Sequence, residues 1–443
     1  MVTSSRESIS TAAPSGFRDF LNLEAKRRAK LIKIISDVYE SFGFSPIDTP
    51  ALENSNVLLS SGGGEENEKL IFKVLKRGDK LKAALESQNE NEISDLGMRF
   101  DLTVPLSRVV ANYRNEIHFP WKVYHIANVW RAERAQKGRF REFTQCDVDI
   151  VGSKSHAAEL EVIQVVAHAV AKAGAENFEL RINDRRLLSS LAEYFGFKGN
   201  LINPFSIALD KKDKAKPEEI RRELDELLGK KCSNEIDELI SGNLSFEKIK
   251  KINPEVSGEL KNLIDQLKAL NLPLSAITFD PSLARGLSYY TGAVFELRHP
   301  SAGYSLGGGG RYDQLIGRFS KQEIPACGFS IGFDRLLLLL TETEKAKNSV
   351  LFIPIFSEDL RIPLCHLANG LRREGITVDV YPDEAKLKTQ FKYAADLQYQ
   401  WVLIVGEDEW KTKTFKLKDF SSGQETSVSE ANLISHLKKF TFK

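Results

Sequence analysis

The residues best suited to chemistry lie close together between Val129 and Gly152, in the stretch VWRAERAQKGRFREFTQCDVDIVG. This stretch has the pattern of two strands joined by a basic loop, and in a strand every second residue lies on the same face. The first strand then carries Arg131 and Glu133 on one face. One face of the second carries a guanidinium, an aromatic ring, an amide and two carboxylates, from Arg141, Phe143, Gln145, Asp147 and Asp149.

These side chains suit a ligand that has both a phosphate and a cationic or imidazole-like part. The planar guanidinium of arginine binds two phosphate oxygens at once, while carboxylate and amide oxygens accept hydrogen bonds from N–H groups. The alternative interpretation is a solvated hairpin face crossed by ion pairs. Further residues of the same kind elsewhere in the chain favour the ligand site.

Asp101 and Thr103 resemble the start of a second ligand surface. We predict a strand over 98–103, in which both residues share a face, and a helix from Pro105. A third polar segment begins at Arg285, before a predicted strand over 290–297. Its neighbours Tyr289 and Tyr290 would be ordinary core aromatics if the pair stood alone.

Two later segments have the composition of ligand-contacting backbone. SLGGGGRYDQLIG contains four consecutive glycines that permit close approach of the backbone to another group, although the spacing is not that of a dinucleotide-binding loop. Arg335 falls in the first turn of a helix predicted to begin near Asp334. Because the helix dipole disfavours a cation there, we expect Arg335 to have an anionic partner such as a phosphate.

The chain that must position these residues has 443 residues, which predicts about three domains. A content of 42% hydrophobic and 28% charged residues is typical of a soluble globular protein, and no apolar run approaches the roughly 20 residues of a membrane helix. The four cysteines and seven histidines lack the spacing of zinc or disulfide sites, so we expect a cytoplasmic location, while the identity of any metal ligands stays open. A net charge of +1 means that any nucleic acid must be bound by local basic patches.

The predicted elements suggest an α+β architecture. A helix over 24–42 is followed by FSPIDTPALEN, a proline-bearing edge strand where a second chain could pack, as could other parts of this one. After the hairpin come a helix over 156–173, a strand over 178–184, and a charged helical insertion over about 186–271. Residues 349–443 alternate as βαβαβ with a closing hairpin, which predicts a separate α/β domain.

Taken together, these segments resemble the histidyl-tRNA synthetases, which are class II aminoacyl-tRNA synthetases. The helix over 24–42 with Pro50 is similar to class motif 1, WRAERAQKGRFREF to motif 2, and GFSIGFDR to motif 3. RGLSYYTGAVFE and GGGRYDQL are similar to the two histidine signature peptides of the family. The resemblance implies a catalytic domain over 1–345, built on an antiparallel sheet flanked by helices, and an anticodon-binding domain over 349–443.

The resemblance also implies substrates and roles. The expected partners are L-histidine, ATP with Mg²⁺, tRNA(His) and a second copy of the chain. The α-amino group of histidine would be held by Asp101, Thr103 and Gln145. Its imidazole would be recognised by Asp149 and Tyr290, with Tyr289 and Tyr312 completing the pocket. ATP would be bound by Arg131, Glu133, Phe143 and Arg335, with Phe143 on the adenine opposite Arg335. Arg285 and Arg131 would act on the α-phosphate, and tRNA would meet Gln136, Lys137 and Arg139.

Two positions depart from the family pattern. Asp101 stands where many members have Glu, and Ser288 stands where an acidic residue is common. A competing hypothesis is the related histidine-sensing regulatory subunit of ATP phosphoribosyltransferase. Such chains typically lack the anticodon domain and the arginines that contact ATP, whereas this one has Arg131, Arg285 and residues 349–443.

Overall fold

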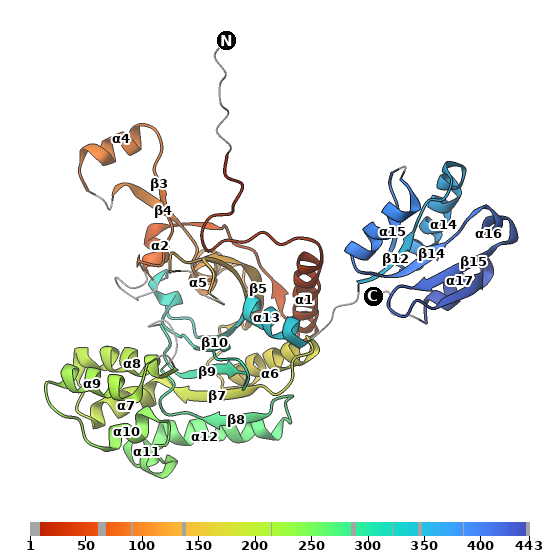
Figure 1. Cartoon of the computed structure of the whole chain (residues 1–443). Helices are drawn as coiled ribbons and strands as arrows, with labels where there is room; N and C mark the ends of the chain where they lie inside the picture. Colours follow the sequence, from red (N-terminus) through yellow and green to blue (C-terminus); the bar gives the residue numbers. More distant parts are fainter. Residues whose placement is uncertain are drawn as a thin grey trace. The chain divides into compact units, whose positions relative to one another are not determined.

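A computed structural model describes residues 9–60, 68–89, 92–134, 139–213, 215–284, 289–320, 322–343, 348–383 and 385–439 (Figure 1). The chain divides into two compact units. The larger contains residues 1–19 and 28–342, and the smaller contains residues 20–27 and 343–443. No helix within the described ranges is long and apolar enough to span a membrane.

An eight-stranded sheet forms the centre of the larger unit, within the described residues. Its strands, in spatial order, are β1 (Ser45–Pro46), β5 (Trp121–Trp130), β6 (Glu142–Val151), β11 (Ala326–Gly332), β10 (Ser305–Arg311), β9 (Ala293–Arg298), β7 (Glu179–Asp184) and β8 (Ala276–Phe279). The pairs at the two edges are parallel and the inner pairs are antiparallel. The predicted antiparallel sheet is therefore confirmed, and the proline-bearing strand β1 lies at an edge.

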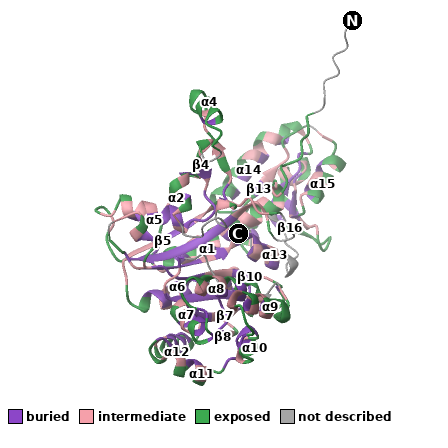
Figure 2. Cartoon of the chain, turned by 90° about the vertical axis from the view of Figure 1, so that its left-hand side faces the viewer, coloured by how far each residue is buried: buried purple, intermediate pink, exposed green. Residues whose placement is uncertain are grey.

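Helices α1 (Asn22–Ser41), α6 (Ala157–Lys172) and α13 (Phe333–Thr343) contribute to one hydrophobic core with this sheet. Alternate residues of β6, namely Cys146, Val148 and Ile150, belong to that core together with Ile35 and Val162. Burying each aliphatic side chain of this size contributes about 1.5–3 kcal/mol. The strands are largely buried in Figure 2. The period of two then directs the odd-numbered residues of β6 to the opposite face.

A second sheet has three strands, in the order β2 (Leu52–Asn54), β4 (Ser94–Met98) and β3 (Lys73–Leu75). The helices of the same part of the sequence are α2 (Ser55–Leu59), α4 (Asp79–Glu86) and α5 (Thr103–Asn112). The predicted strand over 98–103 is wrong here, because β4 ends at Met98 and Thr103 already begins α5. The reason is local: Asp101 Oδ1 accepts a hydrogen bond from Val104 N at 3.1 Å, which stabilises the start of the helix.

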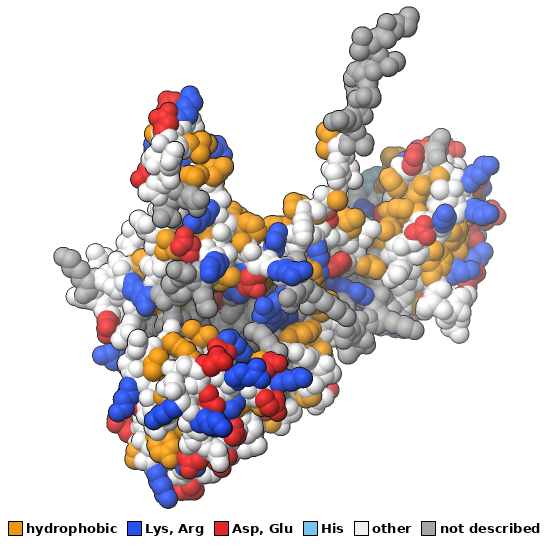
Figure 3. Space-filling view, turned by 60° about the vertical axis from the view of Figure 1, so that its left-hand side comes forward, with side chains coloured by type: hydrophobic (Ala, Val, Ile, Leu, Met, Phe, Trp, Pro, Cys, Tyr) orange, Lys and Arg blue, Asp and Glu red, His pale blue; other side chains and the backbone are white. Residues whose placement is uncertain are grey.

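The helical insertion consists of α7 (Arg185–Tyr194), α8 (Ile202–Asp210), α9 (Pro217–Leu228), α10 (Glu235–Ile240), α11 (Phe246–Ile252) and α12 (Pro254–Ala269). Its apolar faces are buried through residues such as Leu224 and Leu239. Its charged faces carry ion pairs such as Arg221–Asp237, and Figure 3 shows basic and acidic side chains interspersed over the surface. The charge runs of this region are thus solvated faces, as the sequence predicts.

The smaller unit is an α/β domain with a five-stranded sheet, among the described residues. Its strands, in spatial order, are β13 (Val378–Val380), β12 (Asn348–Ile353), β14 (Tyr399–Ile404), β15 (Thr414–Asp419) and β16 (Glu425–Ser429). Its helices are α14 (Arg361–Arg373), α15 (Leu387–Asp396), α16 (Glu407–Thr412) and α17 (Glu430–Leu437). The first three strands are parallel and the last two form a hairpin, as predicted. The sequence prediction did not include α16 and α17.

Candidate active site

The odd-numbered residues of β6 present three buried polar side chains away from the helical core. Gln145, Asp147 and Asp149 are 8%, 3% and 4% exposed, respectively. Each is paired in register with a residue of β11, namely Gly332, Ser330 and Gly328. The polar face predicted from alternation therefore exists, and it is buried rather than solvated. The structure thus favours the ligand-site interpretation over the solvated hairpin face.

Two glycines of the neighbouring strands, Gly328 and Gly310, leave room for the side chains on this face of β6. A β-carbon at Gly328 would lie only 1.8 Å from Asp149 Oδ1. Gly310 of β10 pairs with Gly328, and a β-carbon there would lie 3.0 Å from the Tyr290 ring. Side chains at these two positions would occupy the volume that Asp149 and Tyr290 now fill. The glycines of β10 and β11 therefore leave the room that the side chains of Asp149 and Tyr290 occupy.

Three tyrosines surround Asp149. The ring centroid of Tyr289 lies 4.9 Å from that of Tyr290 and 6.0 Å from that of Tyr312. The Tyr312 hydroxyl donates a hydrogen bond of 2.6 Å to Asp149 Oδ1. Tyr290 precedes the strand that the sequence predicted to begin there, because β9 starts only at Ala293. The predicted histidine pocket residues are thus brought together around one carboxyl group.

Asp101 and Thr103 lie at the start of α5, close to the same pocket. Asp101 is 2% exposed, and the charges of Asp147 and Asp149 both interact with it. Thr103 interacts with the hydroxyl of Tyr289. The residues predicted to hold the amino group therefore adjoin the residues predicted to hold the imidazole.

Burial is the main influence on the ionisation of these carboxyl groups. It raises the pKa of Asp101 to about 6, and that of Asp149 to about 7 even though the Tyr312 hydrogen bond lowers it. The pKa of Asp147 is raised well above its ordinary value, first by burial and then by the charge of Asp149. Ionised carboxylates crowded in a buried site favour a ligand that brings positive charge or N–H donors.

The arginine and aromatic residues predicted to bind ATP lie around the end of the hairpin. Arg131 and Glu133 follow β5, which ends at Trp130, so the expected strand alternation does not extend to them. The Arg131 guanidinium lies 5.0 Å from the Phe143 ring centroid, and its Nε donates to the Phe100 carbonyl oxygen at 2.9 Å. A guanidinium that donates through Nε in this way can present its Nη N–H groups to a ligand.

Arg335 and Arg139 have separate partners. Arg335 Nη1 donates to the Ser305 carbonyl oxygen at 2.8 Å, and the guanidinium lies 5.6 Å from the Tyr304 ring centroid. Arg139 Nη1 lies 3.2 Å from Glu133 Oε2. The structure therefore places Arg131 over Phe143 and Arg335 over Tyr304. The predicted residues Arg285, Gln136 and Lys137 lie outside the described residues.

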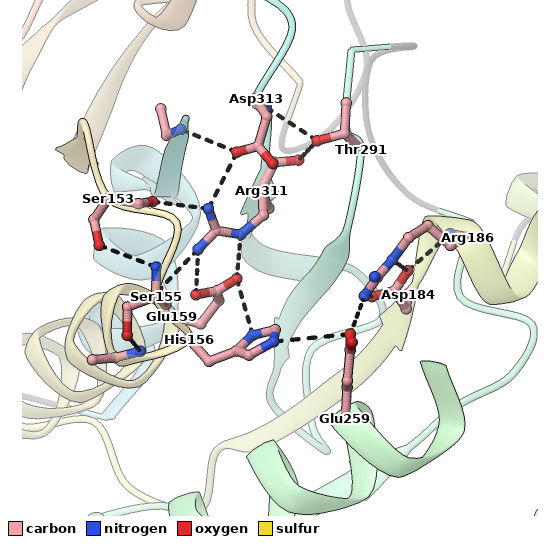
Figure 4. A network of polar contacts seen from close by, with 12 residues as sticks. Ser153, Ser155, His156, Glu159, Asp184, Arg186, Glu259, Thr291, Arg311 and Asp313 are labelled. Atoms are coloured by element: carbon pink, nitrogen blue, oxygen red, sulfur yellow. Dashed lines mark hydrogen bonds and ion pairs between the residues drawn. The ribbon is translucent and has the colours of Figure 1, made fainter. Parts of the chain in front are cut away.

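A buried ion pair that the sequence did not reveal joins Arg311, next to the pocket residue Tyr312, to Glu159 (Figure 4). Arg311 Nε and Nη2 each donate to Glu159 of α6 at 2.6 Å, and Arg311 Nη1 lies 3.1 Å from Asp313. Because Arg311 directly precedes Tyr312, this pair fixes the backbone that carries the tyrosine. The only sequence signal was the position of Arg311 within GGGRYDQL, since Glu159 lies 152 residues away.

The same network continues to the helical insertion. His156 lies 3.7 Å from Glu159 and 3.8 Å from Glu259 of α12. Glu259 in turn pairs with Arg186 at 2.7 Å, and Arg186 also pairs with Asp184 at the end of β7 (Figure 4). Polar contacts therefore connect Arg311, at the end of β10 and next to Tyr312, to the insertion through residues far apart in the sequence.

Asp334 holds the start of α13. Its Oδ1 accepts hydrogen bonds from Arg28 at 2.5 Å and Arg18 at 2.9 Å, and its Oδ2 accepts from Thr144 N at 2.9 Å. Carboxylates at a helix N-terminus are stabilised by the helix dipole. These bonds link α1, β6 and α13, and they fix the turn from which Arg335 extends.

Comparisons with known proteins give one consistent result. Residues 16–336 match the family described as histidyl-tRNA synthetase, and residues 349–440 match an anticodon binding domain. A histidine–tRNA ligase from Christiangramia forsetii is 38% identical over 96% of this chain and 98% of its own length. One from Flavobacterium johnsoniae is 36% identical over 94% of this chain and 96% of its own length. The crystal structure of histidyl-tRNA synthetase from Nostoc sp. PCC 7120 superposes with a TM-score of 0.81 at 26% identity, covering 98% of this chain and all of that one.

Proposed function

The chain belongs to the histidyl-tRNA synthetase family, and we propose that the polar face of β6 and the tyrosines around it form its pocket for L-histidine. The reaction is that of a class II histidine–tRNA ligase. Histidine and ATP first form histidyl-adenylate and pyrophosphate, and the histidyl group then passes to the 3′ end of tRNA(His). The single observation that carries the site assignment is the hydrogen bond from Tyr312 to the buried carboxyl of Asp149.

Asp149 and Tyr290 recognise the imidazole in this proposal. The bond from Tyr312 fixes one oxygen of Asp149, which leaves the other to accept the imidazole N–H. Tyr289 and Tyr312 enclose the ring and exclude side chains of different shape. A site whose buried polar groups need a specific N–H partner rejects substrates without it strongly, because the polar groups would then stay unpaired.

The amino group of histidine is bound by Asp101, Thr103 and Gln145. This contact orients the carboxylate of the bound histidine toward the α-phosphate of ATP. Holding both reactants in line removes much of the entropic cost of the step. The proposal is supported by the position of Asp101 at the start of α5, beside the pocket that contains Gln145 and Asp149.

ATP is held by Arg131, Glu133, Phe143 and Arg335. The carboxylate oxygen of histidine attacks the α-phosphorus, a new O–P bond forms, and the bond to pyrophosphate breaks. Negative charge builds on the phosphoryl oxygens, where Arg131 and Arg285 stabilise it without a protein acid or base. Phe143 stacks on the adenine, Glu133 orients it, and Arg335 contacts the far end of the triphosphate.

In the second step the terminal ribose hydroxyl of tRNA attacks the carbonyl carbon, and AMP leaves with its phosphate as the proton acceptor. Arg139 with Gln136 and Lys137 contacts the acceptor end. We assign the anticodon to the domain over 349–443, and both chemical steps to the domain over 1–345. The match of residues 349–440 to an anticodon binding domain supports this division.

Mg²⁺ enters this proposal as part of the ATP substrate. Among the described residues no cluster of three His, Cys, Asp or Glu side chains could hold a metal ion. Mg²⁺ commonly binds through substrate phosphates and waters, so the protein needs no cage of its own. We further propose a homodimer, for which the family motif 1 segment is the candidate interface, and a cytoplasmic location, which the free cysteines support.

The competing function is histidine sensing without catalysis. A Bacillus halodurans protein titled ATP phosphoribosyltransferase regulatory subunit/histidyl-tRNA synthetase shares the fold, with a TM-score of 0.71 at 23% identity. The anticodon binding domain over 349–440 and the retained Arg131 and Arg335 favour the ligase.

ATP–pyrophosphate exchange measured with each of the twenty amino acids tests the assignment. We expect exchange with L-histidine alone, and charging of tRNA(His) by the same preparation. Histidine binding without any exchange would instead support the sensor.

A further inference from the structure

Asp147 is buried among the pocket residues and has no part in the proposed reaction. It lies between Gln145 and Asp149 on the same face of β6, and the residue is 3% exposed. Its Oδ1 has no hydrogen-bond partner among the described residues. Burying a carboxylate oxygen without a hydrogen-bond donor costs free energy. A ligand that supplies the donor would remove this cost.

Two oxygens of neighbouring pocket residues, Asp101 Oδ2 and Gln145 Oε1, are also buried without a hydrogen-bond donor within the described part of the chain. Three acceptor oxygens without donors therefore belong to one pocket. A primary ammonium group carries three N–H donors and a positive charge, and it matches this set both in number and in sign.

Ser330 orients two of these acceptors. Gln145 Nε2 donates to Ser330 Oγ at 2.7 Å, which turns the amide oxygen of Gln145 the other way. Ser330 also forms a side-chain hydrogen bond with Asp147. Because Ser330 stands opposite Asp147 in the β6–β11 pair, it can engage one oxygen of that carboxyl while Oδ1 stays available.

His125 does not supply the missing positive charge. It stands opposite Asp147 on β5, but burial and the charge of Arg99 lower its pKa to about 4. Its Nε2 lies 3.5 Å from Asp48 Oδ1. A neutral imidazole at this place adds no positive charge, and although the charge of Arg131 lowers the pKa of Asp147, Asp147 Oδ1 has no hydrogen-bond donor among the described residues.

We propose that the Asp147 carboxylate binds the α-ammonium group of the amino acid substrate, together with Asp101 and Gln145. This inference rests on the proposed histidine-binding function and adds a residue to it. Asp149, whose Oδ1 is engaged by Tyr312, faces the imidazole. Asp147, which is two residues from Gln145 on the same face of β6, faces the amino group. Thr103, which interacts with Tyr289, keeps its proposed place beside the amino group.

The test separates the amino group from the imidazole. Binding of L-histidine, L-histidinol and imidazolepropionate to the full-length protein is measured by titration calorimetry. Histidinol keeps the amine and lacks the carboxylate, whereas imidazolepropionate lacks the amine. Asp147→Asn should weaken histidine and histidinol at least tenfold and leave imidazolepropionate within twofold. Asp149→Asn is the matched control, since it should weaken all three ligands.

Equal losses for imidazolepropionate and histidinol in Asp147→Asn, or no loss for either, would overturn the proposal. If Asp147→Asn does not fold, as judged by its melting transition, Asp147→Ser is compared in the same way. Failure of the wild-type protein to bind L-histidine would overturn the proposed function itself, and is thereby distinguished from failure of this inference alone.

Discussion

Gly328 stands directly opposite Asp149 in the β6–β11 pair, and a β-carbon at Gly328 would lie 1.8 Å from Asp149 Oδ1. The carboxyl that we assign to the imidazole therefore occupies the space that a side chain at position 328 would need. A strand residue in this sheet is glycine because of a side chain in the neighbouring strand.

Gly328→Ala should displace Asp149 and damage histidine recognition. We expect the KM for histidine in pyrophosphate exchange to rise at least tenfold, the KM for ATP to change less than threefold, and stability to fall by about 1–3 kcal/mol. Gly258→Ala is the control, because the residue is in helix α12 and the added carbon would meet no atom within 4 Å beyond its chain neighbours and the helix's own backbone. An unchanged KM for histidine in Gly328→Ala would contradict the assignment.

Tyr312→Phe should shift the pH dependence of histidine use. The hydrogen bond from Tyr312 lowers the pKa of Asp149, which is about 7. Its loss should raise that pKa, so the acidic limb of kcat/KM for histidine should move to higher pH. Tyr399→Phe removes a 2.7 Å bond to Asp379 in the smaller unit and should leave the limb in place. The profile between pH 5 and 9 measures the shift, and a movement toward lower pH would refute this reasoning.

Asp149→Asn should stabilise the protein at alkaline pH while it impairs histidine use. Burial raises the pKa of Asp149 from its ordinary value of 3.8 to about 7. The folded state therefore binds a proton that the unfolded state has lost between these values, and wild-type stability falls as pH rises through that window. The amide has no such proton to lose.

The stability gain of Asp149→Asn should thus be small near pH 4, grow up to about pH 7, and then stay constant at no more than roughly 4 kcal/mol. Urea unfolding at pH 5 and pH 8 measures it. A larger gain at pH 5 than at pH 8 would show that the sign is wrong.

Glu159→Gln should destabilise the larger unit, because it removes the buried countercharge of Arg311 and leaves only the partly exposed Asp313, 3.1 Å away. Removing one member of a buried ion pair costs about 3–5 kcal/mol. Glu223→Gln, which breaks an exposed pair with Lys211, should cost about 0–1 kcal/mol. Denaturant midpoints of the two variants give the comparison, and similar values would mean that the Arg311–Glu159 pair contributes little.

The sequence was informative where local alternation decides the structure. The period of two in β6 correctly grouped Gln145, Asp147 and Asp149 on one face, and the helical and strand patterns located most elements. It was less informative where a side chain sets a boundary. The predicted strand over 98–103 was wrong because β4 ends at Met98 and the bond from Val104 N to Asp101 stabilises the start of α5 at Thr103.

Other features depend on residues that only the fold brings together. Glu159 and Arg311 are separated by 152 positions, and neither residue type alone indicates a buried pair. Asp147 was visible as a polar residue, but its importance depends on the missing donor at Oδ1 within the described residues. Neither property follows from local pattern, since both require the positions of strands distant in sequence.

We propose above all that the Asp149 carboxyl recognises the imidazole of L-histidine. The most direct test is the kcat/KM for histidine in ATP–pyrophosphate exchange by Asp149→Ala, measured beside the KM for ATP. We predict a loss of at least a hundredfold for histidine, equivalent to about 3 kcal/mol, with the KM for ATP within threefold of wild type. A variant that keeps wild-type kcat/KM for histidine and still rejects the other amino acids would contradict the claim.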